Sequence, residues 1–473
     1  FDIDSCSRLV EKRWRPFFLE TSHHITTMKS IAQIAAELQG YDPQALSADA
    51  VNAFLERLVE PVTQTERVPL FGALGRVLAE DIVSPISVPP HDNSAMDGFA
   101  FDGAQLVPGQ PLALKIVGTA LAGPAWRGRV VRGECVKIMT GAVMPEGLDT
   151  VVPQEFTRVE DDTVTVPADV VKPGDNRRKL GEDLMAGQTA LQKGERLAPA
   201  ALGLVASLGL AEVTVFRRLR VAYFSTGDEI LSFGEAPREG AVYDSNRYTV
   251  FGLLTRLGVQ VIDLGVVKDD PALLEAAFTQ AAAQADAVIT SGGVSVGEAD
   301  YTKAMMRKLG DVAFWRIAMR PGRPMAVGRI AGGSLAKSAF SADSASADSY
   351  SDDSNHAILF GLPGNPVAVM VTFYAFVRPA LLRMMGARPE SPVLLRAASE
   401  EPMRKKPGRT EYQRGIVTRH ADGSLSVRTT GNQGSGVLSG MVKANGLIVL
   451  GHAQGNVAVG DAVSVMMFEG ATG

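Results

Sequence analysis

Cysteine and histidine are scarce in this chain of 473 residues. Only Cys6 and Cys135 are present, which excludes a disulfide framework and a thiolate zinc site. The 6 histidines are scattered and no HExxH motif occurs, so a histidine-based metal site is not expected. Such low cysteine usage fits a reducing compartment, and we expect a cytoplasmic protein.

Long apolar runs and an excess of positive charge are also missing. The best candidate for a membrane span, Val367 to Val377, has 11 residues and ends at Arg378-Pro379, whereas a span needs about 20 residues. Lys plus Arg total 47 and Asp plus Glu total 52, a net charge of −5. A mildly acidic chain offers little to phosphate backbones, so we expect neither nucleic acid nor membrane as a partner.

Alternating strand-like and helical segments fill residues 219–386, and this pattern predicts a mostly parallel sheet with helices on both faces. Residues 62–175 and 391–469 consist instead of short β-like runs separated by proline and glycine. An amphipathic helix is expected over residues 48–60. With 46% hydrophobic and 21% charged residues, the chain is long enough for about three globular domains.

Two segments depart from globular composition. Residues 1–27 have no signal-peptide core and are expected to form a disordered extension, with a partner-binding arm as the alternative. Residues 331–356 contain 8 Ser and 4 Asp and no aliphatic cluster, which predicts a disordered insertion between two strands. A phosphorylated switch is the other interpretation of that insertion.

Two glycine-containing loops follow predicted strands. In the first, Ser291, Gly292, Gly293 and Ser295 precede a helix, and such a loop either binds an anion through its backbone N–H groups or is an ordinary tight turn. No P-loop lysine follows it, which excludes an ATPase P-loop. The second loop, Pro363-Gly364-Asn365-Pro366, either presents backbone groups to a ligand or is a rigid connector.

Acidic and basic side chains accompany these loops. Asp228-Glu229, Asp269-Asp270 and Glu298 with Asp300 follow predicted strands, where they could converge on Mg²⁺ or simply be solvated. Arginine suits oxyanions because its planar fork donates several hydrogen bonds, although surface charge is the simpler explanation. The arginines concerned are Arg316, Arg320, Arg323, Arg409 and Arg414.

Taken together, the motifs occur in the order found in one family. They are Asn93 to Ala100, Thr140-Gly141-Ala142 with Pro145-Glu146-Gly147, Arg178, Gly181-Glu182-Asp183, Ser225 to Glu229, Tyr243 to Arg247, Ser291 to Tyr301, Pro321 to Pro324, Leu362 to Pro366, Pro407-Gly408-Arg409 and Gly431 to Ser435. With them the chain resembles the MoeA family of molybdenum-inserting transferases, which includes the E domains of gephyrin and plant Cnx proteins. The resemblance covers about residues 30–470.

The resemblance implies an elongated, multidomain α/β plus β subunit. Its expected parts are a helical, elongated domain (28–85 with 184–217), a β-rich domain (86–183), a three-layer α/β domain that binds molybdopterin (218–390), and a small barrel-like β domain (391–473). It also implies a homodimer whose two subunits jointly build each active cleft.

The resemblance further implies site residues. Catalysis falls on Asp97, Glu229, Asp269 and Asp300, with Mg²⁺ held by Glu229, Asp269 and Asp300. Substrate binding falls on Thr140, Asp183, Ser291, Gly292, Gly293, Ser295, Pro363, Gly364, Asn365 and Pro366, and molybdate binding on Arg316, Arg320, Arg323, Arg409, Arg414 and Ser435. Arg316 and Arg320 stand where the family often has lysine.

The implied activity is insertion of molybdate into adenylylated molybdopterin with release of AMP. Contacts with the molybdopterin adenylyltransferase and with molybdoenzymes would accompany it. Two alternatives remain at this point: the adenylyltransferase itself, which has a similar α/β domain, and a scaffold of the gephyrin E-domain type.

Overall fold

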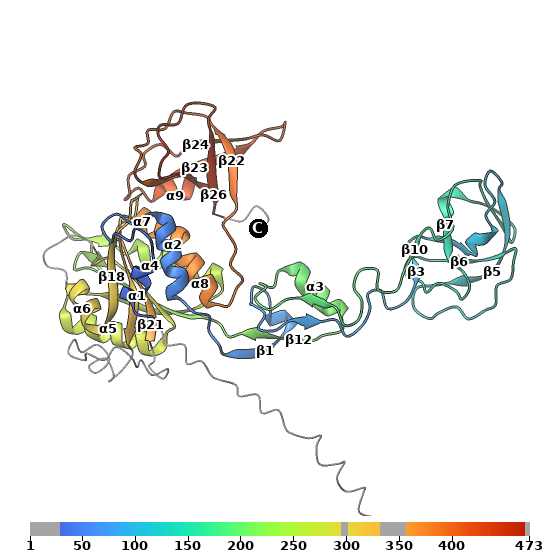
Figure 1. The fold of residues 1–473 in the computed structure, drawn as a ribbon, viewed down its shortest axis with the longest axis horizontal. Helices are drawn as coiled ribbons and strands as arrows, with labels where there is room; N and C mark the ends of the chain where they lie inside the picture. Colours follow the sequence, from blue (N-terminus) through green and yellow to red (C-terminus); the bar gives the residue numbers. More distant parts are fainter. Residues whose placement is uncertain (1–28, 295–300, 332–355, 469–473) are drawn as a thin grey trace, which may run out of the picture.

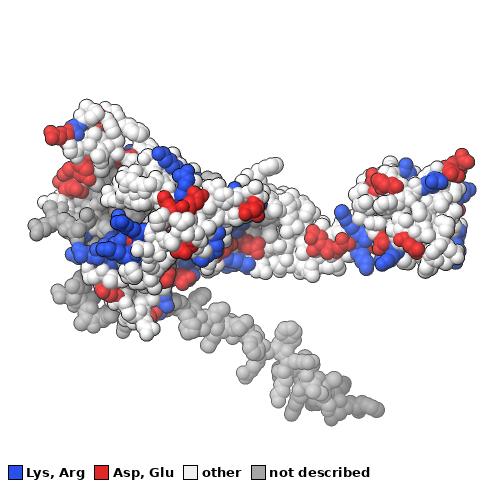
Figure 2. All heavy atoms as spheres, turned by 90° about the horizontal axis from the view of Figure 1, so that it is seen from above, with Lys and Arg blue, Asp and Glu red and all other residues white. Residues whose placement is uncertain are grey.

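Four bodies make up the computed structural model, which describes residues 29–294, 301–331 and 356–468. An α/β domain and a small barrel lie together at one end, and a slender arm connects them to a β-rich domain at the other end (Figure 1). On the face shown in Figure 2, acidic and basic side chains are interspersed along the whole length. The expected multidomain α/β plus β architecture is confirmed. Residues 1–27 and most of the Ser/Asp-rich insertion lie outside the described residues.

A six-stranded sheet forms the centre of the α/β domain, in the order β16–β13–β17–β21–β20–β18. These strands are β13 (Arg220–Thr226), β16 (Gln260–Val267), β17 (Ala287–Ser291), β18 (Gly310–Arg316), β20 (Pro324–Ala331) and β21 (His356–Leu362). The first four in the order are parallel, and β20 is antiparallel to both of its neighbours. Successive residues of β13 enter opposite cores, Tyr223 on one face and Phe224 on the other, so the strand is apolar on both sides.

Helices cover both faces of the sheet, which gives the three layers. α5 and α6 pack on one face, and α4, α7 and α8 pack on the other. Their bounds are α4 (Ser245–Leu257), α5 (Pro271–Gln284), α6 (Tyr301–Leu309), α7 (Pro366–Thr372) and α8 (Arg378–Met384).

One helix extends well beyond the apolar run from Val367 to Val377. A π-helical turn, Phe373–Val377, joins α7 to α8, so the helix passes Arg378-Pro379 and runs for 19 residues from Pro366 to Met384. Among the described helices it alone has the length and hydropathy of a membrane span, but 67% of its apolar stretch is buried. Pro379 follows directly after the π-helical turn, inside the continuous helix.

The first two helices, α1 (Ile31–Ala36) and α2 (Ala48–Leu58), also belong to this core, although the sequence groups them with the elongated region. Ser47 caps α2 by accepting a hydrogen bond from the N–H of Ala50. The apolar face of α2 is buried, and the ring of Phe54 meets that of Trp315 edge-on at 4.9 Å. Packing, rather than position in the chain, decides where an amphipathic helix belongs.

The arm and the β-rich domain have separate small cores. The arm contains β1 (Thr65–Pro69), β2 (Ile82–Val83), β11 (Thr189–Leu191), α3 (Pro199–Ser207) and β12 (Glu212–Phe216). The β-rich domain has a six-stranded sheet of β4 (Gly98–Phe101), β5 (Leu112–Ala120), β6 (Glu134–Ile138), β7 (Thr150–Pro153), β8 (Arg158–Glu160) and β9 (Thr163–Val166), and a ribbon of β3 (Asn93–Ser94) and β10 (Arg177–Arg178).

A closed five-stranded barrel forms the C-terminal body, because β23 pairs with both β24 and β25. Its strands are β22 (Leu394–Ser399), β23 (Thr410–Arg419), β24 (Leu425–Thr429), β25 (Gly446–Leu450) and β26 (Ala462–Met467), and α9 (Ser439–Lys443) follows β24. A short strand from the α/β segment, β19 (Met319–Arg320), adds to the edge of β23. The barrel is therefore fixed to the α/β domain beside Arg320.

A partly buried ion pair joins the arm to the α/β domain. Arg217 follows β12, and its two terminal guanidinium nitrogens donate to the carboxylate of Asp286 at 2.7 and 2.6 Å. The backbone N–H of Arg220 donates to the same carboxylate at 2.7 Å. Burial alone would raise the pKa of Asp286, but these hydrogen bonds outweigh it and hold the pKa below its ordinary value of 3.8.

We expect Asp286→Asn to lower the free energy of unfolding by about 2 kcal/mol at neutral pH, because it leaves Arg217 without its counter-charge. Because folding lowers the pKa of Asp286, the ion pair contributes fully to the free energy of unfolding at any pH above the pKa that Asp286 has in the unfolded chain. This contribution is lost as the pH falls through the pKa of Asp286 in the folded protein.

Urea unfolding of the wild-type protein and of Asp286→Asn from pH 7 to pH 2 measures the contribution. Asp263→Asn, which opens the more exposed pair with Arg247, is the control and should cost under about 1 kcal/mol. A difference between Asp286→Asn and wild type that persists unchanged at pH 2 contradicts the assignment.

Candidate active site

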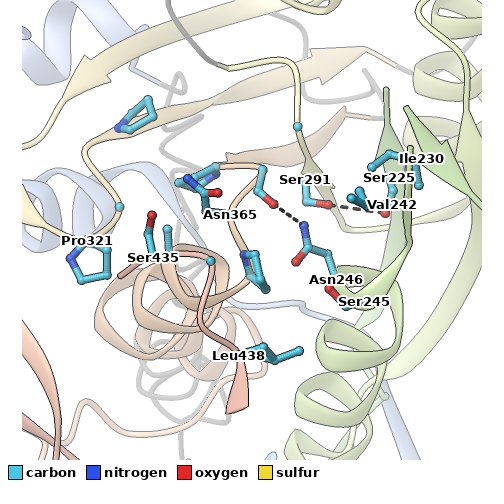
Figure 3. A pocket seen from close by; sticks show the side chains of 18 of the residues that line it. Ser225, Ile230, Val242, Ser245, Asn246, Ser291, Pro321, Asn365, Ser435 and Leu438 are labelled. Carbon is cyan, nitrogen blue, oxygen red and sulfur yellow. Dashed lines mark hydrogen bonds between the residues drawn. The ribbon is translucent and has the colours of Figure 1, made fainter. Parts of the chain in front are cut away.

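A cavity of about 980 Å³ lies where the carboxyl ends of β13, β17 and β21 meet the barrel (Figure 3). Its wall includes the ends of these strands, the short strand pair β14 (Ile230–Leu231) and β15 (Val242–Tyr243), the loop Arg320–Pro324, and the barrel loop from Gln433 to Gly436. Crevices at the carboxyl edge of an open parallel sheet are the usual ligand sites of such folds. The cavity is thus built by both domains.

The first glycine loop forms part of the floor. Ser291 ends β17, and Gly292 follows with a φ of +95°. A Cβ atom at Gly292 would lie 2.4 Å from the carbonyl oxygen of Thr226, so only glycine fits there. The N–H of Gly292 donates to the carbonyl of Leu362 at 3.2 Å. Ser291, Gly292 and Gly293 line the cavity together, and Ser295 lies outside the described residues.

The second glycine loop lies beside the first and is held from two sides. The side-chain amide of Asn246 donates to the carbonyl of Gly364 at 2.7 Å. The N–H of Val367 donates to the carbonyl of Ser435 at 3.1 Å, which ties the barrel loop to the start of α7. Asn365 stands at the N-cap of α7 without a capping hydrogen bond from its side chain. The predicted loop residues Pro363, Gly364, Asn365 and Pro366 all line the cavity.

The predicted acids separate into three groups. Glu229 is exposed in the cavity wall, and its carboxylate lies against Gly227, where a Cβ atom would be 2.6 Å from Oε2. Asp269 does not line the cavity, but its N–H donates to the carboxylate of Asp228 at 3.3 Å, so the two acid-bearing loops touch. Asp270 instead caps α5, while Asp300 lies outside the described residues.

The arginines also have different positions. Arg320 and Arg323 are exposed and line the cavity, whereas Arg316 is exposed at the end of β18 and does not line it. Arg409 forms an ion pair with Glu411 at 2.6 Å. Three of the predicted anion ligands therefore line the cavity: Arg320, Arg323 and, from the barrel, Ser435.

Arg414 has a structural task that the sequence does not reveal. It is only 1% exposed, and its guanidinium donates to the carbonyls of Gly434 at 2.9 Å, Val437 at 3.2 Å and Asn432 at 2.7 Å. Burial lowers its pKa. In place of the predicted contact with an anion, Arg414 positions the loop that carries Ser435.

Asp97 and Thr140 lie in the β-rich domain, at the opposite end of the molecule from the cavity (Figure 1). Asp183 donates its N–H to the carbonyl of Val88, where the β-rich domain joins the arm. Asp97 accepts hydrogen bonds from the N–H and the hydroxyl of Thr140, both at 2.7 Å. These bonds lower the pKa of Asp97. One chain does not bring these residues to the cavity.

Other residues line the cavity that the sequence alone does not assign to a site. Asp244, Ser245 and Asn246 line the cavity just before and at the start of α4, and Thr226 lies beside Ser225. Among the described residues, Thr226 Oγ1 and Asn246 Oδ1 are buried without a hydrogen-bond partner, which leaves them available to a ligand. In the sequence, the polar run Asp244 to Asn246 looks like the ordinary start of a helix, and nothing in it indicates that these residues also line a cavity.

Three regions of the chain match family models. Residues 46–209 match the "MoeA N-terminal region (domain I and II)", residues 222–383 a "probable molybdopterin binding domain", and residues 396–468 the "MoeA C-terminal region (domain IV)". The cavity lies between the second and third of these regions.

Whole-chain relatives agree. The molybdopterin molybdenumtransferase of Haemophilus influenzae is 41% identical over 420 residues, covering 89% of this chain and 97% of that protein. The enzyme of the same name from Bacillus subtilis is 31% identical over 411 residues, covering 85% and 90%. The crystal structure of the molybdopterin biosynthesis moeA protein from Pyrococcus horikoshii superposes with a TM-score of 0.72 at 26% identity, covering 90% and 100%. With all three regions matched in order, the chain belongs to the MoeA family.

Proposed function

We propose that the cavity binds adenylylated molybdopterin and that molybdate is inserted there, with release of AMP, as a step of molybdenum cofactor biosynthesis. The observation that carries this is the meeting of two glycine loops, two arginines and a barrel serine around a cavity of about 980 Å³. A site of that size suits a substrate made of a pterin joined to a nucleotide. The name shared by the curated relatives supports the same activity.

Each wall of the cavity has a separate role in the proposal. Ser291 binds a phosphate through its hydroxyl and Gly293 through its N–H, while Gly292 lets the backbone make its turn and the loop from Pro363 to Pro366 forms the adjoining wall. The guanidinium groups of Arg320 and Arg323 offset the charge of the molybdate dianion and of the phosphates, and Ser435 adds a hydroxyl. Arg316, at the end of β18, would steer anions toward this wall.

The proposal assigns Mg²⁺ to the acidic side of the site, where the described residues alone supply no group of three metal-ligating side chains. The loops bearing Glu229 and Asp269 touch through Asp228, and carboxylate oxygens are the ligands that this ion prefers. Glu229 and Asp269 would hold the ion, and the sequence places Asp300 after the neighbouring strand as a third ligand. When bound, Mg²⁺ supplies positive charge to phosphate oxygens as the phosphoanhydride breaks.

A homodimer completes the proposal. Asp97, Thr140 and Asp183 lie far from the cavity of their own chain, so a second chain has to supply them if they act in it (Figure 1). In this arrangement the β-rich domain of each subunit reaches the cavity of the other. We place this dimer in the cytoplasm. There it would receive its substrate from the adenylyltransferase and pass its product to molybdoenzymes.

The alternatives differ in what they consume. A molybdopterin adenylyltransferase needs ATP, and a scaffold needs no turnover. The test is to incubate the protein with adenylyl-molybdopterin, Mg²⁺ and molybdate and then add a cofactor-free molybdoenzyme. We expect the molybdoenzyme to become active only when molybdate was present. Activation that needs ATP, or no activation at all, would favour the adenylyltransferase or the scaffold.

A further inference from the structure

Three hydroxyl groups form a cluster in the cavity floor: those of Tyr223, Ser225 and Ser291. The tyrosine oxygen lies 2.9 Å from Ser225 Oγ and 2.7 Å from Ser291 Oγ, and the two serine oxygens are 3.4 Å apart. Both serines line the cavity (Figure 3). Tyr223 does not line it and is only 1% exposed, in the core beneath.

The positions of these groups follow from the strands that carry them. Ser225 and Ser291 are paired in register on the parallel strands β13 and β17, so their hydroxyls lie side by side. Tyr223 is two residues before Ser225 and thus points to the same face of the sheet. Its ring fills the core, and its hydroxyl reaches the gap between the serines. Among the described residues, these hydroxyls have no further hydrogen-bond partner.

The number of hydrogens restricts what the cluster can do. Each hydroxyl donates one hydrogen bond, so Tyr223 donates to one serine while it accepts from the other. The serine that accepts from Tyr223 keeps its own hydrogen. At 3.4 Å the other serine is a poor acceptor for that hydrogen, whereas a ligand oxygen in the cavity would be a good one.

We propose that Tyr223 is a positioning residue that directs the hydrogen of one serine hydroxyl at a time, from Ser225 or Ser291, toward an anionic oxygen of the ligand. Either serine can serve, because their oxygens lie close enough to reach the same ligand atom. Burial raises the pKa of Tyr223, so its hydroxyl stays protonated throughout the physiological range. The inference rests on the proposed function only for the identity of the ligand, a phosphate group.

The test is a double-mutant cycle on the two serines, with AMP binding measured by calorimetry. If either serine alone can present a hydrogen, Ser225→Ala and Ser291→Ala should each weaken AMP binding by no more than about threefold. The double variant should weaken it by at least about tenfold more than the product of the two single-variant effects. In a Tyr223→Phe background the serines are no longer coupled, and the same cycle should become additive. Tyr41→Phe, which removes a tyrosine hydroxyl bonded to Trp315 elsewhere in this core, is the matched control and should leave binding unchanged.

Each result of this experiment is decisive. Additive serine effects in the otherwise wild-type protein would overturn the inference, and that measurement stands even if Tyr223→Phe proves unstable. A cycle that is equally non-additive with and without the Tyr223 hydroxyl would assign the coupling to the serines alone and overturn the role of Tyr223. No binding of AMP by the wild-type protein would overturn the phosphate assignment and this inference with it. Normal AMP binding with additive serines leaves the proposed function intact.

Discussion

Glu229→Gln is expected to lower turnover by at least about 100-fold while the protein stays folded. Among the described residues, Glu229 and Asp244 are the two acids that line the cavity. Asp244 is buried at the N-cap of α4, where it accepts a hydrogen bond from the N–H of Arg247. Glu229 is therefore the exposed carboxylate of the described cavity wall. Glutamine keeps its size but removes the charge that would hold Mg²⁺. Steady-state rates at saturating substrate, with melting temperatures alongside, measure the effect.

Glu239→Gln is the matched control, since Glu239 is exposed in the loop between β14 and β15 and does not line the cavity. Its turnover should equal that of the wild-type protein. Excess Mg²⁺ should recover part of the Glu229→Gln activity if the lost group is a metal ligand. Turnover of Glu229→Gln within about threefold of wild type would remove Glu229 from the catalytic assignment.

Mixed dimers of Asp97→Asn and Glu229→Gln subunits are expected to regain activity that neither variant has alone. Each mixed dimer combines one intact α/β cavity with one intact β-rich domain at the same site, and the other site carries both changes. Equal mixing gives about half mixed dimers with one working site each, so about a quarter of wild-type activity is expected. Asparagine can still accept hydrogen bonds from Thr140, which keeps the Asp97→Asn domain folded.

The control is a mixture of Asp97→Asn with Thr140→Ala subunits. Both changes affect the β-rich domain, so no mixed dimer contains a wild-type site and no activity should return. No recovery in the first mixture would show that each chain uses its own Asp97 or that Asp97 does not act in the cavity. Recovery in the control would show that subunit mixing restores activity without an intact site, which would remove the first mixture as evidence for a shared cavity.

Much of the α/β domain was predictable because its signal is local. Strands such as Ala287–Ser291 are apolar on both faces, and the glycine loops after them stand where the carboxyl edge of a parallel sheet must lie. These features predicted Ser291, Gly292 and the loop from Pro363 to Pro366, all of which line the cavity.

The remaining features depend on contacts between distant segments. Arg414 has the same side chain as an anion-binding arginine, and only the three carbonyls of its loop reveal that it is a structural residue. The sequence indicates only that Tyr223 is a core aromatic residue, whereas the structure places its hydroxyl between two serine hydroxyls. The packing of α1 and α2 on the α/β core is equally invisible in the sequence, because an apolar helix face does not specify its partner.

We propose that the cavity between the α/β domain and the barrel inserts molybdate as the phosphoanhydride of adenylyl-molybdopterin is cleaved. The most direct test is quantification of AMP after incubation of the purified protein with adenylyl-molybdopterin and Mg²⁺, with and without molybdate. We expect AMP to appear only with molybdate and in an amount equal to the molybdenum cofactor formed. AMP release at the same rate without molybdate would contradict it.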